Sequence, residues 1–168
     1  IEHFVVRSTT AAERLAEMTP RFAFRSAVPE SQRNTRREML EIANMYFVGM
    51  QKNDGLMDYP FADDCERIEN GMRSTNAPTP PGETRPDPSD ASVYSSQWSC
   101  LEQFQSGLIF FVNRIRDRRF VAVDEERGLV FSFVFFDHSG GEFRHGVTPA
   151  GREVTAGPVQ PWTWGIAE

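Results

Sequence analysis

The chain has 168 residues and a mass of 19.1 kDa, which fits one compact domain, and 39% of its residues are hydrophobic. Fourteen Phe, three Trp and three Tyr exclude a disordered chain. No apolar run approaches the roughly 18 to 20 residues that a membrane helix needs. A net charge of -6 argues against duplex nucleic acid as the main partner, because phosphate binding needs a basic face.

The cysteines and histidines are few. Cys65 and Cys100 do not make a disulfide scaffold and lack the spacing of a zinc site, so we expect reduced, buried thiols. The three histidines form no metal-binding pattern, and we expect no metal.

Because the chain begins on Ile1 without Met and stops at Glu168, we expect both ends to be cut. With no signal peptide visible, we expect a cytoplasmic protein.

The first third of the chain predicts a short strand over residues 1–7 and a short helix over 11–18, which a threonine hydroxyl can cap. A long helix follows over residues 32–52. Its apolar residues recur at the spacing of one helix face: Met39, Ile42, Ala43, Tyr46, Phe47 and Met50. We assign residues 1–35 to an N-terminal segment, the tail of a preceding domain in one interpretation, and 36–168 to the main domain.

The middle of the chain predicts a strand over residues 65–69, in which Cys65, Arg67 and Glu69 share a face, followed by an Asn-Gly turn. Five prolines between residues 78 and 90 predict a loop. A second helix is expected from Ser95 or Ser96 to about Ser106.

The last third predicts a hairpin of two strands, residues 113–124 and 129–137. The second strand is apolar on both faces, which indicates a covering helix on one side and an interior on the other. Residues 139–161 are rich in Gly and Pro and predict a long mobile loop, after which strand character resumes over 162–168.

This order of elements resembles the nuclear transport factor two-like superfamily, which includes the ketosteroid isomerases, scytalone dehydratase and SnoaL-like cyclases. The resemblance covers roughly residues 36–168 and rests on Tyr46, Asn53-Asp54 and the segment 61–69. It implies an α+β fold, a cone-shaped and mainly antiparallel sheet packed against helices, with an open-ended pocket and its last strand cut. It also implies a dimer or trimer, because sheet faces of this superfamily commonly pair.

The same resemblance implies functional residues. In ketosteroid isomerase a helix tyrosine is the oxyanion donor, and a carboxylate five residues after an Ala-Asp-Asp turn is the base; the matching positions are Tyr46 and Glu69. The chain departs from that pattern because its turn is one residue shorter and no second acid stands near Ala167. It also lacks the paired pocket histidines of scytalone dehydratase.

Each of these residues has an alternative interpretation. Tyr46 is either a core tyrosine or a donor to substrate oxygen, where one preorganised donor is worth about 3 kcal/mol. Glu69 is either a base, which requires burial, or one half of a salt bridge with Arg67. If the two touch, we expect Glu69 to orient Arg67 while Arg67 binds substrate oxygen.

Other candidates are a histidine and a set of aromatic residues. His138 is either a general acid/base or a surface loop residue. A flat hydrophobic ligand would be lined by Phe61, Trp98, Phe104 and Phe133, which are otherwise plain core. The loops 76–92 and 139–161 would close the pocket mouth.

The function that we expect is a cofactor-independent acid/base enzyme acting on a small hydrophobic, aromatic or polycyclic molecule. Isomerases, dehydratases and carbon-carbon lyases fall within this expectation. No phosphate-binding or dinucleotide motif is present, and neither nucleic acid nor membrane is an expected partner. The alternative is a noncatalytic module of the same fold for ligand binding or oligomerisation.

Overall fold

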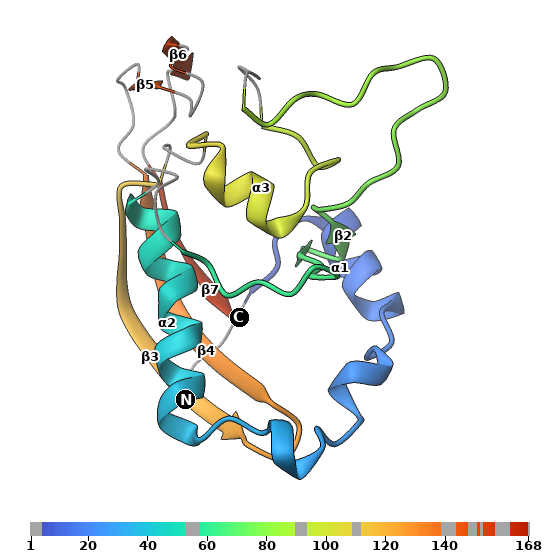
Figure 1. Ribbon diagram of the computed structural model, residues 1–168, viewed down its shortest axis with the longest axis vertical. Coiled ribbons are helices and arrows are strands. Elements are labelled where there is room, and N and C mark those ends of the chain that lie inside the picture. Colours follow the sequence, from blue (N-terminus) through green and yellow to red (C-terminus); the bar gives the residue numbers. More distant parts are fainter. Residues whose placement is uncertain are drawn as a thin grey trace.

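The computed structural model describes residues 5–52, 58–89, 94–108, 112–138, 144–147, 151, 153–156 and 162–167. This part of the chain contains three α-helices, two short 3-10 helices and antiparallel strands (Figure 1). The predicted α+β class is therefore confirmed. None of the helices described is long and apolar enough to cross a membrane.

The largest sheet has the antiparallel strand order β3-β4-β7 and packs against helix α2. Its strands are β3 Arg114–Asp124, β4 Leu129–His138 and β7 Trp162–Ala167, which confirms all three predicted strands. Helix α2 spans Arg36–Lys52 and lies along the sheet. Two register shifts in β3 interrupt its pairing with β4.

Helix α2 begins four residues later than predicted because its first turn is closed locally. The Glu38 carboxylate accepts hydrogen bonds from the backbone N–H and hydroxyl of Thr35, at 2.8 and 2.7 Å. Residues Glu30–Gln32 form a separate 3-10 turn, η2. The helix end at residues 53–55 lies outside the described residues.

The core forms where the predicted apolar stripe of α2 meets the sheet. Phe47 is its centre, with ring centroids 6.3 Å from Phe136 on β4 and 6.2 Å from Phe120 on β3. Gly49 permits close packing of Tyr59, since a Cβ there would stand 2.2 Å from the Tyr59 ring. The helix is also tied to β3 by polar contacts, such as the Ile115 N–H to Gln51 Oε1 hydrogen bond of 2.7 Å.

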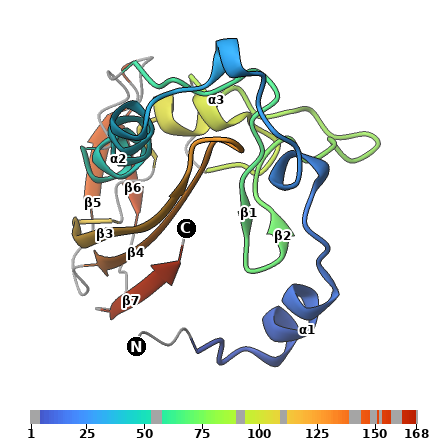
Figure 2. The ribbon, with the colours of Figure 1, turned by 90° about the horizontal axis from the view of Figure 1, so that it is seen from below.

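The N-terminal segment carries helix α1, Thr9–Glu17, and the 3-10 turn η1, Phe22–Phe24. Ser8, rather than a threonine, caps α1, and residues 5–7 form no strand, contrary to prediction; residues 1–4 lie outside the described residues. Helix α1 lies near the turn of a small hairpin (Figure 2). There the Arg14 Nε donates to the Asn70 carbonyl oxygen at 3.2 Å.

That hairpin pairs β1, Ile68–Glu69, with β2, Met72–Arg73, through the predicted Asn70-Gly71 turn, whose residues both have positive φ. The predicted strand over 65–69 is wrong for its first three residues. Two side chains hold that backbone: the Thr75 hydroxyl accepts from the Arg67 N–H at 2.8 Å, and the Asn76 amide donates to the Cys65 carbonyl at 2.9 Å. One backbone hydrogen bond of 2.9 Å, from the Ser74 N–H to the Arg67 carbonyl, adds to them.

Helix α3, Cys100–Gln105, starts later than the predicted helix from Ser95 or Ser96. Ser99 and Glu102 form a reciprocal capping box, which fixes the first turn at Cys100. The proline-rich segment over residues 78–89 contains neither helix nor strand, as predicted.

The predicted loop over residues 139–161 contains a second small hairpin. Strands β5, Arg144–Val147, and β6, Glu153–Ala156, pair antiparallel, so the prediction of a continuous loop is wrong there. Most of the remaining residues of that stretch lie outside the described residues.

A disulfide joins Cys65 to Cys100, with their Cα atoms 5.9 Å apart, and corrects the expectation of reduced thiols. The two cysteines are 35 residues apart in the sequence, so local patterns do not predict their contact. Cys65 lies just before the β1-β2 hairpin, and Cys100 is the first residue of the capped helix α3. The bond ties the segment before β1 to the first residue of α3.

We expect the double variant Cys65→Ser/Cys100→Ser to lose about 2 to 4 kcal/mol of unfolding free energy, because the bond closes a long loop in the unfolded chain. Chemical denaturation of both proteins measures the loss. Reductant should lower the stability of the native protein and leave the variant unchanged. Two free thiols in native protein purified without reductant would contradict the assignment.

Candidate functional site

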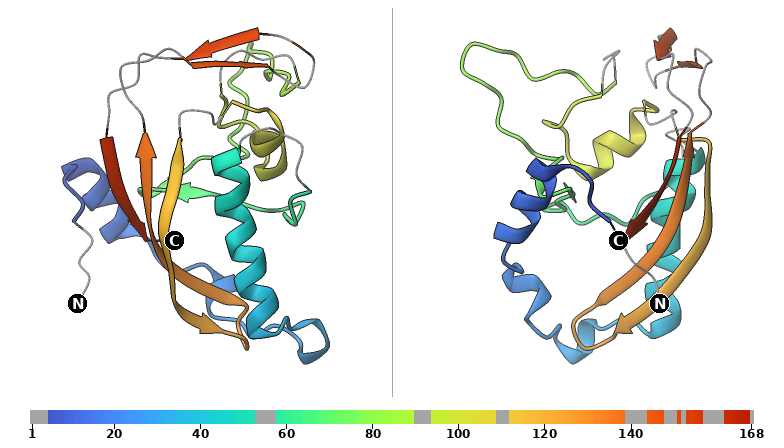
Figure 3. Two further views of the ribbon diagram at one scale, coloured as in Figure 1. Left: turned by 90° about the vertical axis from the view of Figure 1, so that its left-hand side faces the viewer. Right: turned by 180° about the vertical axis from the view of Figure 1, so that it is seen from behind.

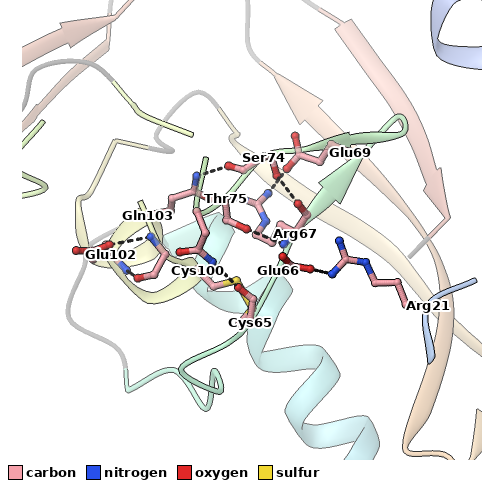
Figure 4. The surroundings of a disulfide bond; sticks show 12 residues. Arg21, Cys65, Glu66, Arg67, Glu69, Ser74, Thr75, Cys100, Glu102 and Gln103 are labelled. Atoms are coloured by element: carbon pink, nitrogen blue, oxygen red, sulfur yellow. Dashed lines mark hydrogen bonds and ion pairs between the residues drawn. A yellow bond between two sulfur atoms is a disulfide. The ribbon is translucent and has the colours of Figure 1, made fainter. Parts of the chain in front are cut away.

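The guanidinium of Arg67 is the centre of a buried polar cluster. Only 11% of this side chain is exposed. Its Nη1 donates to the Tyr94 hydroxyl at 2.6 Å and to Gln103 Oε1 at 2.7 Å, and its Nη2 pairs with the Glu69 carboxylate. Figure 4 shows Arg67 and Gln103 next to the disulfide, while Glu66 points away from it toward Arg21.

Aromatic rings enclose the same guanidinium. Its Cζ lies 5.8 Å from the ring centroid of Tyr46 on α2 and 5.7 Å from that of Phe104 on α3. The Tyr46 and Phe104 rings are 5.3 Å apart, centroid to centroid. A cation over such ring faces is attracted electrostatically, more strongly when water is excluded. The predicted residues Tyr46, Arg67 and Glu69 therefore belong to one cluster.

Electrostatics keep the Arg67 charge in place. Burial alone lowers the pKa of this guanidinium, but electrostatic interactions with Tyr46, Tyr94 and Glu69 and a hydrogen bond with Tyr46 outweigh that effect and raise the pKa overall. Burial raises the pKa of Tyr94, which the neighbouring Arg67 only partly offsets. The site therefore contains a permanent cation beside phenol groups.

Sequence reasoning missed two members of the cluster, Tyr94 and Gln103. Gln103 is fully buried, and its amide donates to the carbonyl oxygens of Ser74 and Ser95, at 2.6 and 3.0 Å. These bonds fix the amide so that its oxygen faces Arg67. A signal existed, because Gln103 shares the buried face of α3 with Cys100 and Phe104, where an amide needs partners. Tyr94 lies outside any helix or strand and carried no such signal.

Glu69 is held by Arg67 but not buried. Half of its side chain, 51%, is exposed, so the burial that we expected of a catalytic base is absent at Glu69. The contact between the two residues meets the condition under which we expected Glu69 to orient the guanidinium.

The predicted aromatic residues divide between two places. Phe61 packs on Phe104, with centroids 5.0 Å apart, and so lies beside the Arg67 cluster. Trp98 packs edge-on against Tyr94, a member of the cluster; it is fully buried, and its Nε1 donates to the Pro86 carbonyl at 2.8 Å. Its role in ligand binding stays a prediction, whereas its packing role is evident.

Two further candidates lie on β4, away from β1 and α3. Phe133 is on the opposite face of the sheet from the buried residues Val134 and Phe136, and its ring contacts Phe131 at 5.1 Å. His138 is at the end of β4 on the buried face and is itself buried, so the surface-loop interpretation does not hold. Its catalytic role remains a prediction.

The chemistry that this arrangement offers is oxygen binding. The Arg67 Nε–H is buried and has no hydrogen-bond partner among the described residues. A guanidinium and a phenol together can stabilise negative charge that develops on a carbonyl or hydroxyl oxygen. The described residues contain no group of three or more His, Cys, Asp or Glu side chains that could hold a metal ion.

Comparison with known proteins gives one family. No curated protein and no solved structure matches the chain. The family model described as "Domain of unknown function (DUF8021)" matches residues 32–160, which include α2, the Arg67 cluster and the β3-β4 hairpin. Because this match spans more than half of the sequence, the chain belongs to the DUF8021 family.

Proposed function

We propose that the chain is an acid/base enzyme without a cofactor that acts on a small hydrophobic, aromatic or polycyclic molecule carrying an oxygen function. The carrying observation is the buried Arg67 guanidinium, fixed by Glu69, Tyr94 and Gln103 against the rings of Tyr46 and Phe104. Isomerisation, dehydration and carbon-carbon cleavage next to a carbonyl group each have a route through an enolate, whose oxygen charge this site would stabilise.

In this mechanism Arg67 binds the substrate oxygen, and the Tyr46 hydroxyl donates a proton to that oxygen and takes it back. Glu69 orients Arg67 through their ion pair, and it also remains our candidate for the proton acceptor. The half-buried ring of Phe61, which packs on the buried Phe104, would stack on the substrate rings. The resemblance to the nuclear transport factor two-like superfamily, including its cone-shaped sheet and open-ended pocket, belongs to this proposal.

We expect Tyr46→Phe to lower kcat/KM by about 100-fold on any substrate that the native protein converts, since one hydroxyl in a dry site is worth about 3 kcal/mol. A panel of aromatic ketones, alcohols and diaryl compounds supplies the substrates. Arg67→Lys should cause a similar loss, because lysine lacks the planar fork of donors.

The matched control is Tyr59→Phe, which removes a hydroxyl from the same aromatic cluster without touching the proposed chemistry. It should retain turnover. Native-like turnover by a folded Tyr46→Phe protein would exclude the mechanism. Binding without turnover by the native protein would favour the noncatalytic alternative.

The disulfide bears on location. Such bonds persist in oxidising compartments and are rare in a reduced cytosol. We therefore propose that the protein works in an oxidising environment, in place of the cytoplasmic location predicted from the sequence.

The oligomerisation alternative is supported by a row of phenylalanines on the main sheet β3-β4-β7. They lie on the face of the sheet that points away from the core. Phe131, Phe133 and Phe135 occupy this face of β4, and Phe131 is 43% exposed. No described helix lies in front of these strands in the left panel of Figure 3. Arg116 and Arg119 stack on Phe135, at 4.7 and 5.7 Å from its ring centroid.

If this face joins copies of the chain, Phe131→Lys should shift a dimer or trimer toward monomer, because a buried charge without a partner destabilises an interface. Light scattering after gel filtration measures the mass. The control is Phe22→Lys, which changes an exposed phenylalanine on the N-terminal segment. A native protein that is monomeric at about 100 μM, where a micromolar interface would be saturated, would refute an oligomer of useful affinity.

A further inference from the structure

A second candidate site lies at the other end of α2, at the bottom of Figure 1, where the chain before the helix passes the β3-β4 turn. A cavity of about 420 Å³ opens there. Its apolar floor is formed by Val28, Met39, Ile42, Ala43 and Val130. This volume is within the range of small-molecule sites, roughly 300 to 1,000 Å³.

The floor leaves apolar surface uncovered. Ile42 belongs to the continuous stripe of α2, yet 39% of it is exposed, whereas Met39 and Phe47 of the same stripe are buried. The cavity walls are held in place by a backbone hydrogen bond of 2.8 Å from the Val28 N–H to the Glu126 carbonyl. Burying the open floor under an apolar ligand would contribute about 25 cal/mol for each Å² covered.

The rim of the cavity presents one oriented cation. Arg33 donates its Nε–H to the Val28 carbonyl at 2.8 Å, which fixes the guanidinium, and no carboxylate pairs with it among the described residues. The other rim arginine, Arg127, is neutralised by Asp124 at 3.0 Å and Glu126 at 3.9 Å.

The surroundings favour an anion on the Arg33 side. Arg33 stands just before the amino end of α2, and Arg36 is the first residue of the helix. The helix end itself is already compensated by the Glu38 carboxylate in its first turn, so the positive charge open to a ligand is that of Arg33. Glu125 lies on the rim too, as part of the β3-β4 turn, so the negative charge of the site is on the turn. A ligand carboxylate is therefore stabilised at Arg33 and repelled from the turn.

We propose that this cavity binds a small amphipathic carboxylic acid, with its chain or ring on the apolar floor and its carboxylate on the guanidinium of Arg33. The site is separate from the Arg67 cluster, and the proposal does not depend on the proposed enzyme activity. It assigns a ligand class that the acid/base mechanism does not use.

Calorimetric titration of the 168-residue chain with decanoate tests the proposal, with decanol as the uncharged probe. We expect decanoate to bind at least about tenfold more tightly than decanol, because a charge-assisted hydrogen bond contributes about 1.5 to 3 kcal/mol. Arg33→Gln should remove this preference, and Ala43→Phe, which fills the floor, should weaken both probes. Arg37→Gln is the control, since this arginine is 84% exposed and pairs only weakly with Glu41 one turn later.

No decanoate binding at millimolar concentration, equal affinity for the two probes, or decanoate affinity unchanged by Arg33→Gln would overturn the proposal. Circular dichroism of each variant reports folding. Arg33 is exposed, so we expect Arg33→Gln to fold. This variant alone therefore tests the proposal if Ala43→Phe does not fold.

Discussion

The buried charge of Arg67 is the constraint on which the surrounding structure depends. An unpaired guanidinium away from water costs several kcal/mol, so every element near it must offer an acceptor or a ring face. Tyr46 comes from α2, Glu69 from β1 and Gln103 from α3, while Tyr94 precedes α3. The Arg67 cation thereby connects α2, β1, α3 and the chain at Tyr94, which do not belong to one sheet.

The disulfide and Gln103 make this arrangement rigid. Cys100 and Gln103 are one turn apart on α3, and Cys65 is two residues before Arg67, so the covalent bond and the Arg67 hydrogen bond connect the same two segments. Gln103 is held in turn by two backbone carbonyls. A group that must keep one orientation toward an oxygen benefits from such support, because each degree of freedom removed beforehand is not lost on binding.

Periodicity predicted the long elements because their apolar faces repeat: α2 with a period near 3.6 and the β3-β4 hairpin with a period of 2. It failed over residues 65–67, where the apolar-polar alternation is present in the sequence but the backbone bonds to the side chains of Thr75 and Asn76 and forms no strand. The contact between Arg67 and Glu69 was foreseeable from their spacing. The contacts to Tyr94 and Gln103, 27 and 36 residues away, depend on loop paths that local patterns do not encode.

The apolar stripe of α2 shows why a pattern read as core need not be core throughout. Its second half, with Phe47 and Met50, is buried in the core, whereas its first half lines the cavity beside the β3-β4 turn, where Met39 is buried and Ile42 is 39% exposed. There the sequence supplies an apolar face without enough side chains to cover it, so Ile42 stays open. One helix thus faces two environments: Tyr46 lies beside a buried cation, and Ile42, four residues earlier, lines an open cavity.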